Sequence, residues 1–224
     1  MSQIQVQDEF REAAAVLSSA FNHAGKTNGD RFCESLTGGN KVFGPLLHQA
    51  HLRAGAIGGE VWAAGFEGSS EICAVAQIKF GDNEEQRAAG WNLLQAKFPP
   101  NLKAWWSKFG SDYSTWSKSC RDKEQDENFK DMKLQSWQLQ LLGTSPDHQG
   151  KGLASQLIQV KDEPSVGMCL EATNLPNVEF YKGKCGFSVR GKPLKIIGPE
   201  ITPDAPRAET EMFCLSKNLE IWEK

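Results

Sequence analysis

The sequence predicts a mixed α/β fold in a single domain, and three observations support this prediction. A length of 224 residues suits one domain with a sizeable core. Amphipathic helical runs alternate along the chain with short apolar runs that are typical of strands. The densest strand–helix–strand signal lies near the C-terminus, where a glycine-containing loop joins a strand to a helix.

The N-terminal part is expected to contain a short strand, two helices and a hairpin. Apolar residues at helical spacing follow an aspartate that can cap a helix. Further along, two apolar runs joined by the turn Glu-Gly-Ser-Ser predict the hairpin. The predicted elements are a strand at 4–7, a helix from Asp8 to about Phe21, a helix at about 41–54, and hairpin strands at 61–66 and 72–80.

The segment at about 82–136 differs in character and is predicted to be a helical, aromatic-rich insertion in the domain 1–224. It combines helix-like runs with a Pro-Pro-Asn break and a strongly charged stretch. Over half of the seven tryptophans lie in it: Trp91, Trp105, Trp106 and Trp116. We expect two or three helices whose aromatic side chains pack on the main sheet.

The C-terminal part is expected to add four strands and two helices. The first of these helices follows the glycine-containing loop and is short, and a glycine ends the second. The predicted elements are a strand at 136–145, a helix to about Val160, a strand at 167–173, a helix at 176–186, and strands at 187–196 and 208–218.

Charge and cysteine usage narrow the class of protein. A formal net charge of −3 gives no electrostatic reason to expect nucleic acid or an anionic membrane as a partner. The N-terminus does not resemble a signal peptide and no run is long and apolar enough to span a bilayer, so we expect a cytoplasmic protein. The six cysteines are scattered singly, which favours reduced thiols over disulfides or zinc; we expect no metal.

The loop "SPDHQGKG" before the first C-terminal helix has the character of an anion-binding turn. It does not fit a Walker A loop, because six residues separate Gly143 from Gly150 and Gly152 follows Lys151 where Ser or Thr is needed. A dinucleotide fingerprint fits poorly, because Ser155 stands at its third glycine position and the unit comes late in the chain.

The loop instead matches the pattern Gln/Arg-x-x-Gly-x-Gly/Ala over the residues from Gln149 to Ala154. A strand follows, and then an asparagine, an aromatic-tyrosine pair and Gly-Phe stand at matching distances. These are Asn174, Phe180, Tyr181, Gly186 and Phe187. Over residues 137–190 the chain resembles the GNAT superfamily of acyl-CoA-dependent N-acetyltransferases.

The resemblance implies a central, mostly antiparallel, twisted sheet with splayed central strands, flanked by helices, and acetyl-CoA as co-substrate. In the family, the backbone before the loop pairs with the pantetheine arm and loop N–H groups bind the pyrophosphate. By resemblance Tyr181 is the general acid that protonates the CoA thiolate, and the N–H of Leu142 is the donor to the oxyanion. The resemblance also implies that Asn174 binds the pantetheine arm; alternatively, Asn174 only caps the next helix. The implied binding residues are Leu142, Gly143, Thr144, Gln149, Gly150, Lys151, Gly152, Leu153, Ala154, Ser155, Asn174 and Tyr181.

The activity implied is acetyl transfer to the amine of a small molecule, by direct attack in a ternary complex. Two alternatives remain open: a protein or peptide N-acetyltransferase, and a non-catalytic acyl-CoA-binding module. The general base is also open, because Gln138 and Gln140 on the strand before the loop cannot take up a proton. Glu71, Asp82 and Glu179 are possible bases. A homodimer is possible.

Overall fold

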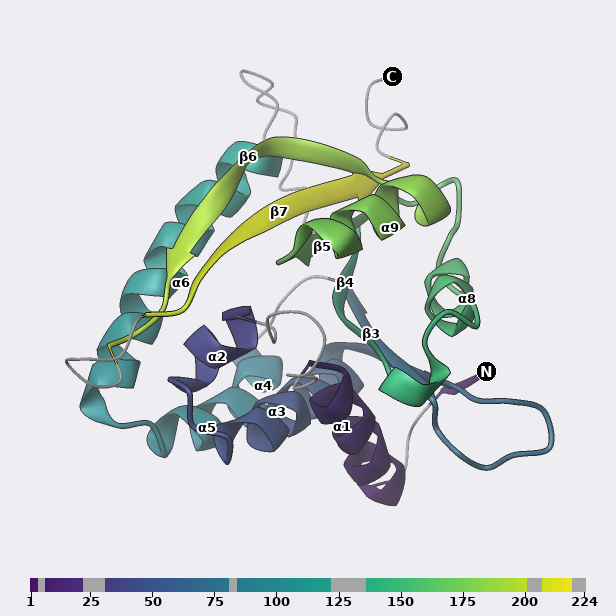
Figure 1. Ribbon diagram of the computed structural model, residues 1–224, viewed down its shortest axis with the longest axis horizontal. Helices are drawn as coiled ribbons and strands as arrows, with labels where there is room; N and C mark the ends of the chain where they lie inside the picture. Colours follow the sequence, from purple (N-terminus) through teal and green to yellow (C-terminus); the bar gives the residue numbers. More distant parts are fainter. Residues whose placement is uncertain (4–6, 22–30, 81–83, 122–135, 201–206, 219–224) are drawn as a thin grey trace.

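Seven strands form one sheet in the order β1-β2-β3-β4-β5-β7-β6 (Figure 1). The computed structural model describes residues 1–3, 7–21, 31–80, 84–121, 136–200 and 207–218. All neighbouring strands are antiparallel except β4 and β5, which are parallel. The strands are β1 (Ser2–Gln3), β2 (Gly59–Ala64), β3 (Ala74–Phe80), β4 (Trp137–Thr144), β5 (Met168–Ala172), β6 (Ser188–Ile197) and β7 (Glu209–Lys217). The predicted mixed α/β class with a mostly antiparallel sheet is therefore confirmed.

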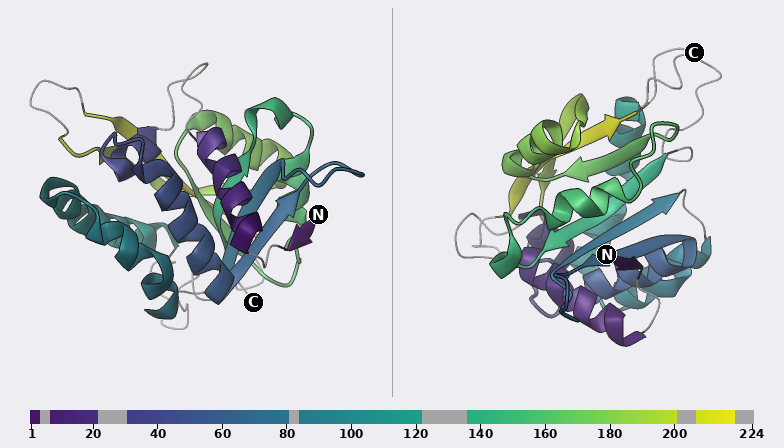
Figure 2. Two further views of the ribbon diagram at one scale, coloured as in Figure 1. Left: turned by 90° about the horizontal axis from the view of Figure 1, so that it is seen from below. Right: turned by 90° about the vertical axis from the view of Figure 1, so that its right-hand side faces the viewer.

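Helices cover both faces of this sheet, as the two views of Figure 2 show. Helices α1 and α3 pack on one face and α8 and α9 on the other, while the long helix α6 runs along β6. The helices are α1 (Gln7–Phe21), α2 (Arg31–Thr37), α3 (Phe43–Gly58), α4 (Glu84–Gln86), the π-helix η1 (Arg87–Trp91), α5 (Asn92–Ala96), α6 (Pro100–Arg121), the 3-10 turn η2 (Pro146–His148), α8 (Leu153–Gln159) and α9 (Leu175–Cys185).

Strand β3 shows why the sheet needs helices on both sides. Successive side chains of a strand point to opposite faces, and both sets in β3 are buried. Ala76 and Ile78 belong to the core beneath α8 and α9. Val75 belongs to the core beneath α1 and α3. A strand that is apolar on both faces is stable only between two layers.

The central strands β4 and β5 separate part-way along their length. Their pairing covers only Trp137 to Leu139 on β4, opposite Met168 to Leu170 on β5. Beyond this point β4 continues to Thr144 beside β3, and the register with β3 shifts so that Gln140 is an extra, bulged residue. The predicted splay of the central strands is thus confirmed, and the bulge lies where it begins.

Several predicted boundaries were wrong at the N-terminal end. Helix α1 begins at Gln7, so Asp8 lies inside its first turn and not at its N-cap, and Gln7 does not belong to a strand. Residues 4–6 of the predicted strand lie outside the described residues. Helix α2 was not predicted, because its seven residues stand between glycine- and asparagine-rich stretches that resemble a loop. The hairpin strands pair over Gly59–Ala64 and Ala74–Phe80, so their connection is longer than the predicted turn.

Residues 84–121, the described part of the predicted aromatic-rich insertion, are largely helical, and two of its tryptophans donate hydrogen bonds to the sheet. The indole N–H of Trp105 donates to the carbonyl of Ile197, and that of Trp116 donates to the carbonyl of Lys192, both at 2.7 Å. The Trp106 indole donates to the Leu36 carbonyl at the end of α2. These bonds fix α6 against β6 and α2, and so fix the surface that α6 presents to the interior.

We expect Trp116→Phe to lower the free energy of unfolding by about 2 kcal/mol, because the smaller ring loses the hydrogen bond to the Lys192 carbonyl and leaves unfilled space where the buried indole packs. Trp116 is only 8% exposed. Urea unfolding followed by circular dichroism measures the change. Trp105→Phe is the matched variant: it removes the same kind of bond from a half-buried ring and should cost less. An equal or larger loss for Trp105→Phe would contradict this account.

The cysteines are mostly buried, and none of the described helices could span a membrane. Five of the six cysteines are buried and none forms a disulfide, in agreement with the prediction of reduced thiols. Within the described ranges, no helix is both long and apolar enough to cross a membrane.

Candidate active site

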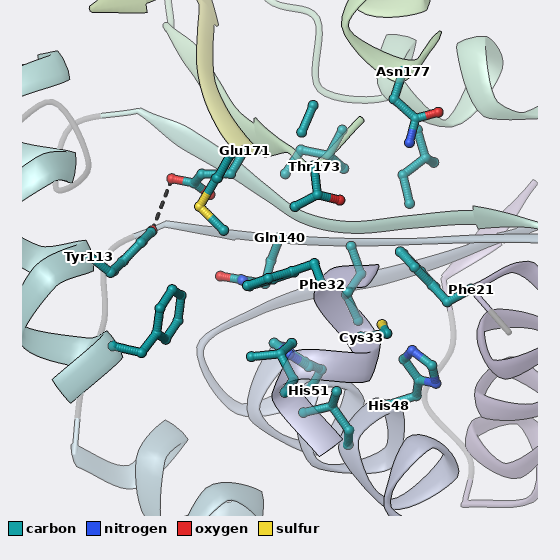
Figure 3. Close-up of a pocket in the computed structure, with 18 of the residues that line it drawn as sticks. Phe21, Phe32, Cys33, His48, His51, Tyr113, Gln140, Glu171, Thr173 and Asn177 are labelled. Carbon is teal, nitrogen blue, oxygen red and sulfur yellow. Dashed lines mark hydrogen bonds between the residues drawn. The ribbon is translucent and has the colours of Figure 1, made fainter. Parts of the chain in front are cut away.

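A cavity of about 280 Å³ lies where β4 and β5 separate (Figure 3). Its lining includes residues from helices on both faces of the sheet: His48 comes from α3 on one face, and Asn177 and Tyr181 come from α9 on the other. The cavity therefore passes through the sheet at the splay. Helix α6 contributes aromatic walls, among them Trp106, Phe109 and Tyr113.

The backbone of Leu142 is directed into this gap. The N–H of Ser145 donates to the carbonyl of Cys73 at 2.8 Å, in register with the β3–β4 pairing. Hydrogen-bonded pairs alternate along an antiparallel ladder, so Leu142 and Thr144 turn their N–H and C=O groups away from β3 and toward the side that β5 has left. The same alternation turns the backbone groups of Gly143 toward β3, which does not favour the predicted role of Gly143 in pairing with a cofactor.

Gly143 has a packing role instead. A Cβ atom at this position would lie 2.9 Å from Cδ2 of Leu17 and 3.2 Å from Cβ of Ala20. Both residues belong to α1, so the absent side chain lets α1 approach β4 closely. Helix α1 is thereby held against the strand that carries Leu142.

Tyr181 lies in the wall of the same cavity and is 8% exposed. Its ring packs edge-on against Phe180 and Phe187, with centroids 5.2 and 5.7 Å away. Burial, with a smaller contribution from Cys185, raises the pKa of the Tyr181 phenol well above its ordinary value of 10. The hydroxyl therefore keeps its proton throughout the physiological range and can act as a donor.

The glycine-containing loop runs from the end of β4 to α8. Gly150 and Gly152 have φ of +77° and +84°, which L side chains adopt only with strain, and no other atom lies within 4 Å of a Cβ built on either glycine. Gly152 is the N-cap of α8 and offers no side-chain cap, so the first N–H groups of that helix face outward. The Gln149 side chain donates to the Thr144 carbonyl at 3.3 Å, which ties the loop to the end of β4.

Several solved structures have a similar fold and align with nearly the whole of this chain. A histone acetyltransferase and related acetyltransferase from Corynebacterium glutamicum has a TM-score of 0.53 at 18% identity, covering 97% of this chain and 96% of its own. A polyamine N-acetyltransferase from Drosophila melanogaster, which forms N-acetylagmatine, has a TM-score of 0.53 at 15% identity, covering 95% and 98%. An N-acetyltransferase from Staphylococcus aureus has a TM-score of 0.52 at 15% identity, covering 96% and 100%.

The chain has the GNAT acetyltransferase fold. No family model matches the sequence, and no curated protein matches it. The likeness is therefore one of structure, at identities too low to carry the activity of any one neighbour. The activity of this chain must therefore be inferred from its own residues.

Two of the residues assigned by resemblance have other contacts in this GNAT fold. The ammonium group of Lys151 lies 5.1 Å from the centroid of the Phe66 ring, in the β2–β3 connection. The Asn174 side chain accepts a hydrogen bond from the N–H of Asn177 at 2.9 Å and so caps α9. This is the alternative that the sequence left open for Asn174. Its Oδ1 is engaged, which leaves its amide N–H groups as the donors it can offer a ligand.

Sequence reasoning did not identify Glu171 as a site residue, although it lines the cavity. Its two carboxylate oxygens accept hydrogen bonds from the Tyr113 hydroxyl at 2.9 Å and from the Gln138 amide at 3.1 Å. The bond to Tyr113 is drawn in Figure 3. The only sequence feature that could have pointed to Glu171 was its position as an acidic residue near the end of the apolar strand predicted at 167–173. Its contact with Tyr113, 58 residues earlier in the chain, could not be predicted from sequence.

His48 was also missed. It is 1% exposed and lines the cavity, and its Nδ1 lies 3.0 Å from the Ser18 hydroxyl on α1. Burial lowers the pKa of its imidazole to about 4. The only sequence feature that could have pointed to His48 was its place on the apolar face of the helix predicted at 41–54. A histidine in such a position is usually only packed in the core.

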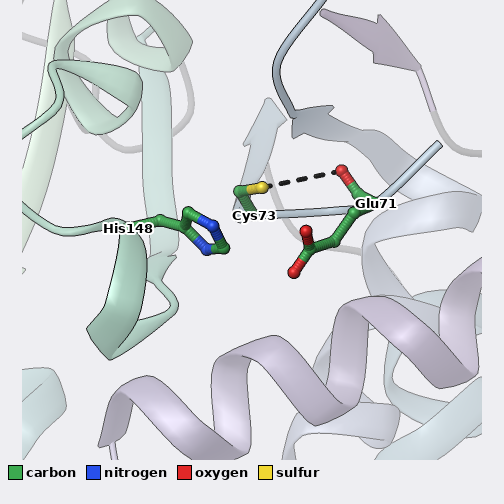
Figure 4. A group of neighbouring side chains, drawn as sticks. All are labelled: Glu71, Cys73 and His148. Atoms are coloured by element: carbon green, nitrogen blue, oxygen red, sulfur yellow. Dashed lines mark hydrogen bonds between the residues drawn. The ribbon is translucent and has the colours of Figure 1, made fainter. Parts of the chain in front are cut away.

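One group of possible metal ligands lies beside the glycine-containing loop. Atoms of Glu71, Cys73 and His148 lie within 4.8 Å of one another (Figure 4). Glu71 is exposed, Cys73 is buried, and the Cys73 thiol makes a long contact of 3.7 Å with the Glu71 carbonyl. The expectation that the chain holds no metal remains a prediction, and these residues are where it would be tested.

We expect Glu171→Gln to raise KM for a cationic amine about tenfold, because a hydrogen bond to a charged group contributes roughly 1.5 kcal/mol or more. Steady-state kinetics with the amine varied give the measurement. The matched control is Glu179→Gln, which removes an exposed carboxylate paired with Lys182 outside the cavity. An equal rise in KM for an uncharged acceptor would show that Glu171 only shapes the cavity.

Proposed function

We propose that the protein transfers an acetyl group from acetyl-CoA to the amine of a small molecule. The observation that carries this proposal is the cavity through the splayed sheet, because both Leu142 and Tyr181 are among the residues that line it. An acyl transferase needs a donor for the carbonyl oxygen and a proton source for the leaving group. These two residues supply both.

The donor half of the site is the loop and the strand before it. In the proposal, N–H groups from Gln149 to Ser155 bind the pyrophosphate, because the two left-handed glycines leave their outer surface open to a ligand. The N–H and C=O groups of Leu142 and Thr144 then pair with the pantetheine amides along the open edge of β4. Lys151 has a minor part, since its ammonium group already lies over Phe66.

The chemical step follows from the protonation state of Tyr181. The amine nitrogen attacks the thioester carbon, the Leu142 N–H stabilises the oxygen that becomes negative, and the carbon–sulfur bond breaks. The departing thiolate takes the proton of the Tyr181 hydroxyl, and the proton that the nitrogen loses as the amide forms returns in the end to the Tyr181 phenolate. A phenol whose pKa is raised by burial is protonated before the step, as a general acid must be.

A small acceptor is favoured over a protein substrate by the walls of the cavity. Aromatic residues of η1 and α6, with residues of α2 and α3, line the space beyond the splay. A peptide would require an open groove, whereas a cavity of about 280 Å³ suits a small molecule. Among the neighbours, the Drosophila melanogaster protein acts on a polyamine, and by analogy supports an amine acceptor.

The alternative of a non-catalytic acyl-CoA-binding module would be favoured if Tyr181 pointed away from the cavity. Tyr181 lines the cavity, which supports an enzyme.

A screen that measures thiol release from acetyl-CoA tests the proposal. Amines, amino acids and peptides should be compared, and we expect turnover with small amines and none above background with peptides. Binding of acetyl-CoA without thiol release for any acceptor would favour the non-catalytic module. Turnover with peptides alone would favour the protein acetyltransferase.

A further inference from the structure

The cavity wall contains a buried imidazole nitrogen for which the proposed chemistry has no use. His48 is 1% exposed, and no described residue is hydrogen-bonded to its Nε2. The other ring nitrogen, Nδ1, lies 3.0 Å from the Ser18 hydroxyl. Buried polar atoms in folded proteins nearly always have a partner, because a missing one destabilises the fold. Because His48 is among the residues that line the cavity, its unpartnered nitrogen is a candidate contact for a bound ligand.

The imidazole is held rigidly by α1. The Phe21 ring stacks on it, with centroids 5.3 Å apart and planes 29° apart, and Ser18 fixes its rotation through Nδ1. Ser18 and Phe21 belong to the same turn of α1 as Leu17 and Ala20, which contact β4 at Gly143. The ring is thus anchored next to the residue that follows Leu142. In Figure 3, His48 and Phe21 lie on the side of Asn177 and away from Tyr113.

We propose that Nε2 of His48 accepts a hydrogen bond from the acceptor amine and then takes up the proton that this nitrogen loses as the amide forms. This inference rests on the proposed acetyl transfer, and it assigns the general base that the sequence left open. It requires the tautomer in which Nδ1–H donates to the Ser18 hydroxyl and the lone pair of Nε2 faces the cavity.

The protons balance across one turnover. A neutral amine forms a bond to the thioester carbon, and the carbon–sulfur bond breaks. The sulfur takes the proton of Tyr181, and Nε2 of His48 takes one proton from the nitrogen. The protonated imidazole and the phenolate then exchange a proton through water, which restores both groups and leaves the amide and the CoA thiol.

The protonation state of the free protein suits this role. Burial lowers the pKa of the imidazole to about 4, so His48 is neutral, with an available lone pair, throughout the physiological range. The other titratable groups that line the cavity are Cys33, His51, Tyr113, Glu171 and Tyr181. A negative charge that develops on the thioester oxygen or on Tyr181 favours the imidazolium, so the basicity of His48 rises as the reaction proceeds.

Nitrogen NMR of the protein labelled with ¹⁵N in histidine tests the assignment without any assay. We expect His48 to show a protonated Nδ1 and an unprotonated Nε2 at neutral pH, and to titrate well below an ordinary histidine. A proton on Nε2 in the free protein would overturn the proposal, whatever the enzyme does. The spectrum of His48→Leu identifies the signal.

Stability and turnover should separate in His48→Leu. Leucine removes the unpartnered Nε2 but also the contact of Nδ1 with Ser18, so we expect these effects to offset and the thermal midpoint to stay within a few degrees of the wild type, with turnover reduced about 100-fold. Gln49→Leu, the next residue on α3 and outside the cavity lining, is the matched control and should retain full turnover. Wild-type turnover in His48→Leu would overturn the proposal.

His48→Gln gives a second measurement, because an amide retains a hydrogen-bond acceptor but cannot take up a proton. KM for the amine should remain within about threefold of the wild type while kcat falls about 100-fold. A change in KM alone would overturn the base assignment. If the wild type shows no turnover with any amine, the proposed function fails and the NMR result alone decides the state of His48.

Discussion

Tyr181→Phe is expected to lower kcat by about 100-fold or more, because a positioned general acid contributes 10²–10⁴-fold to a rate. Binding of acetyl-CoA should remain near that of the wild type, since the ring keeps its contacts with Phe180 and Phe187. The deficit should shrink as pH rises past about 8.5, where a thiol can leave without taking a proton. Thiol release measured between pH 6.5 and 9.5, together with calorimetric binding of acetyl-CoA, gives both quantities.

The wild-type profile provides an internal check on this role. Because burial raises the pKa of Tyr181, its ionisation should cause no loss of activity below pH 10. Tyr113→Phe, at the only other tyrosine, is the matched variant. It removes the donor to Glu171, so KM for the amine should change while the pH dependence of kcat remains that of the wild type. A Tyr181→Phe deficit that is constant with pH would exclude Tyr181 as the acid.

The second large effect concerns the loop before α8. We expect Gly152→Val to raise the Kd for acetyl-CoA by about 10- to 100-fold. A left-handed conformation costs an L residue roughly 1–2 kcal/mol, which is about tenfold in affinity if binding requires it. The new side chain would also enter the open space in which the pyrophosphate is proposed to bind.

Lys151→Ala is the control for this prediction, because it removes a charge from the same loop without changing the backbone. Its ammonium group lies over Phe66, so the Kd should change at most about fivefold, as is usual for an exposed charge. Calorimetric titration of each variant with acetyl-CoA gives the measurement. A larger loss for Lys151→Ala than for Gly152→Val would mean that charge, and not backbone approach, holds the pyrophosphate.

The fold was predictable where local pattern determines structure. The apolar runs that became β4, β5 and β7 and the glycine-terminated helix α9 were placed within one or two residues. Helix α2 was missed because seven residues between glycine-rich stretches carry too little periodicity. The bulge at Gln140 depends on pairing with β3, and a pattern along a single strand does not contain this information.

For the candidate site, the sequence carries a signal only on the proposed donor side, where the motif from Gln149 to Ala154 is contiguous. The proposed acceptor side depends on contacts between distant segments: Glu171 contacts Tyr113 across 58 residues, and His48 contacts Ser18 across 30. Neither contact has a local signal. The same residue types occur more often on surfaces or in cores, so only their convergence on a cavity distinguishes them.

The bonds between α6 and β6 also affect how copies of the protein can meet. An edge strand offers unpaired backbone groups to another chain, which is a common route to aggregation. At β6, the indoles of Trp105 and Trp116 already occupy two carbonyls, and the ladder with β7 is interrupted between Arg190 and Leu194, where Pro193 has no N–H to give. Strand β6 is therefore a poor template for strand addition, and an association between copies through that edge would first have to displace α6.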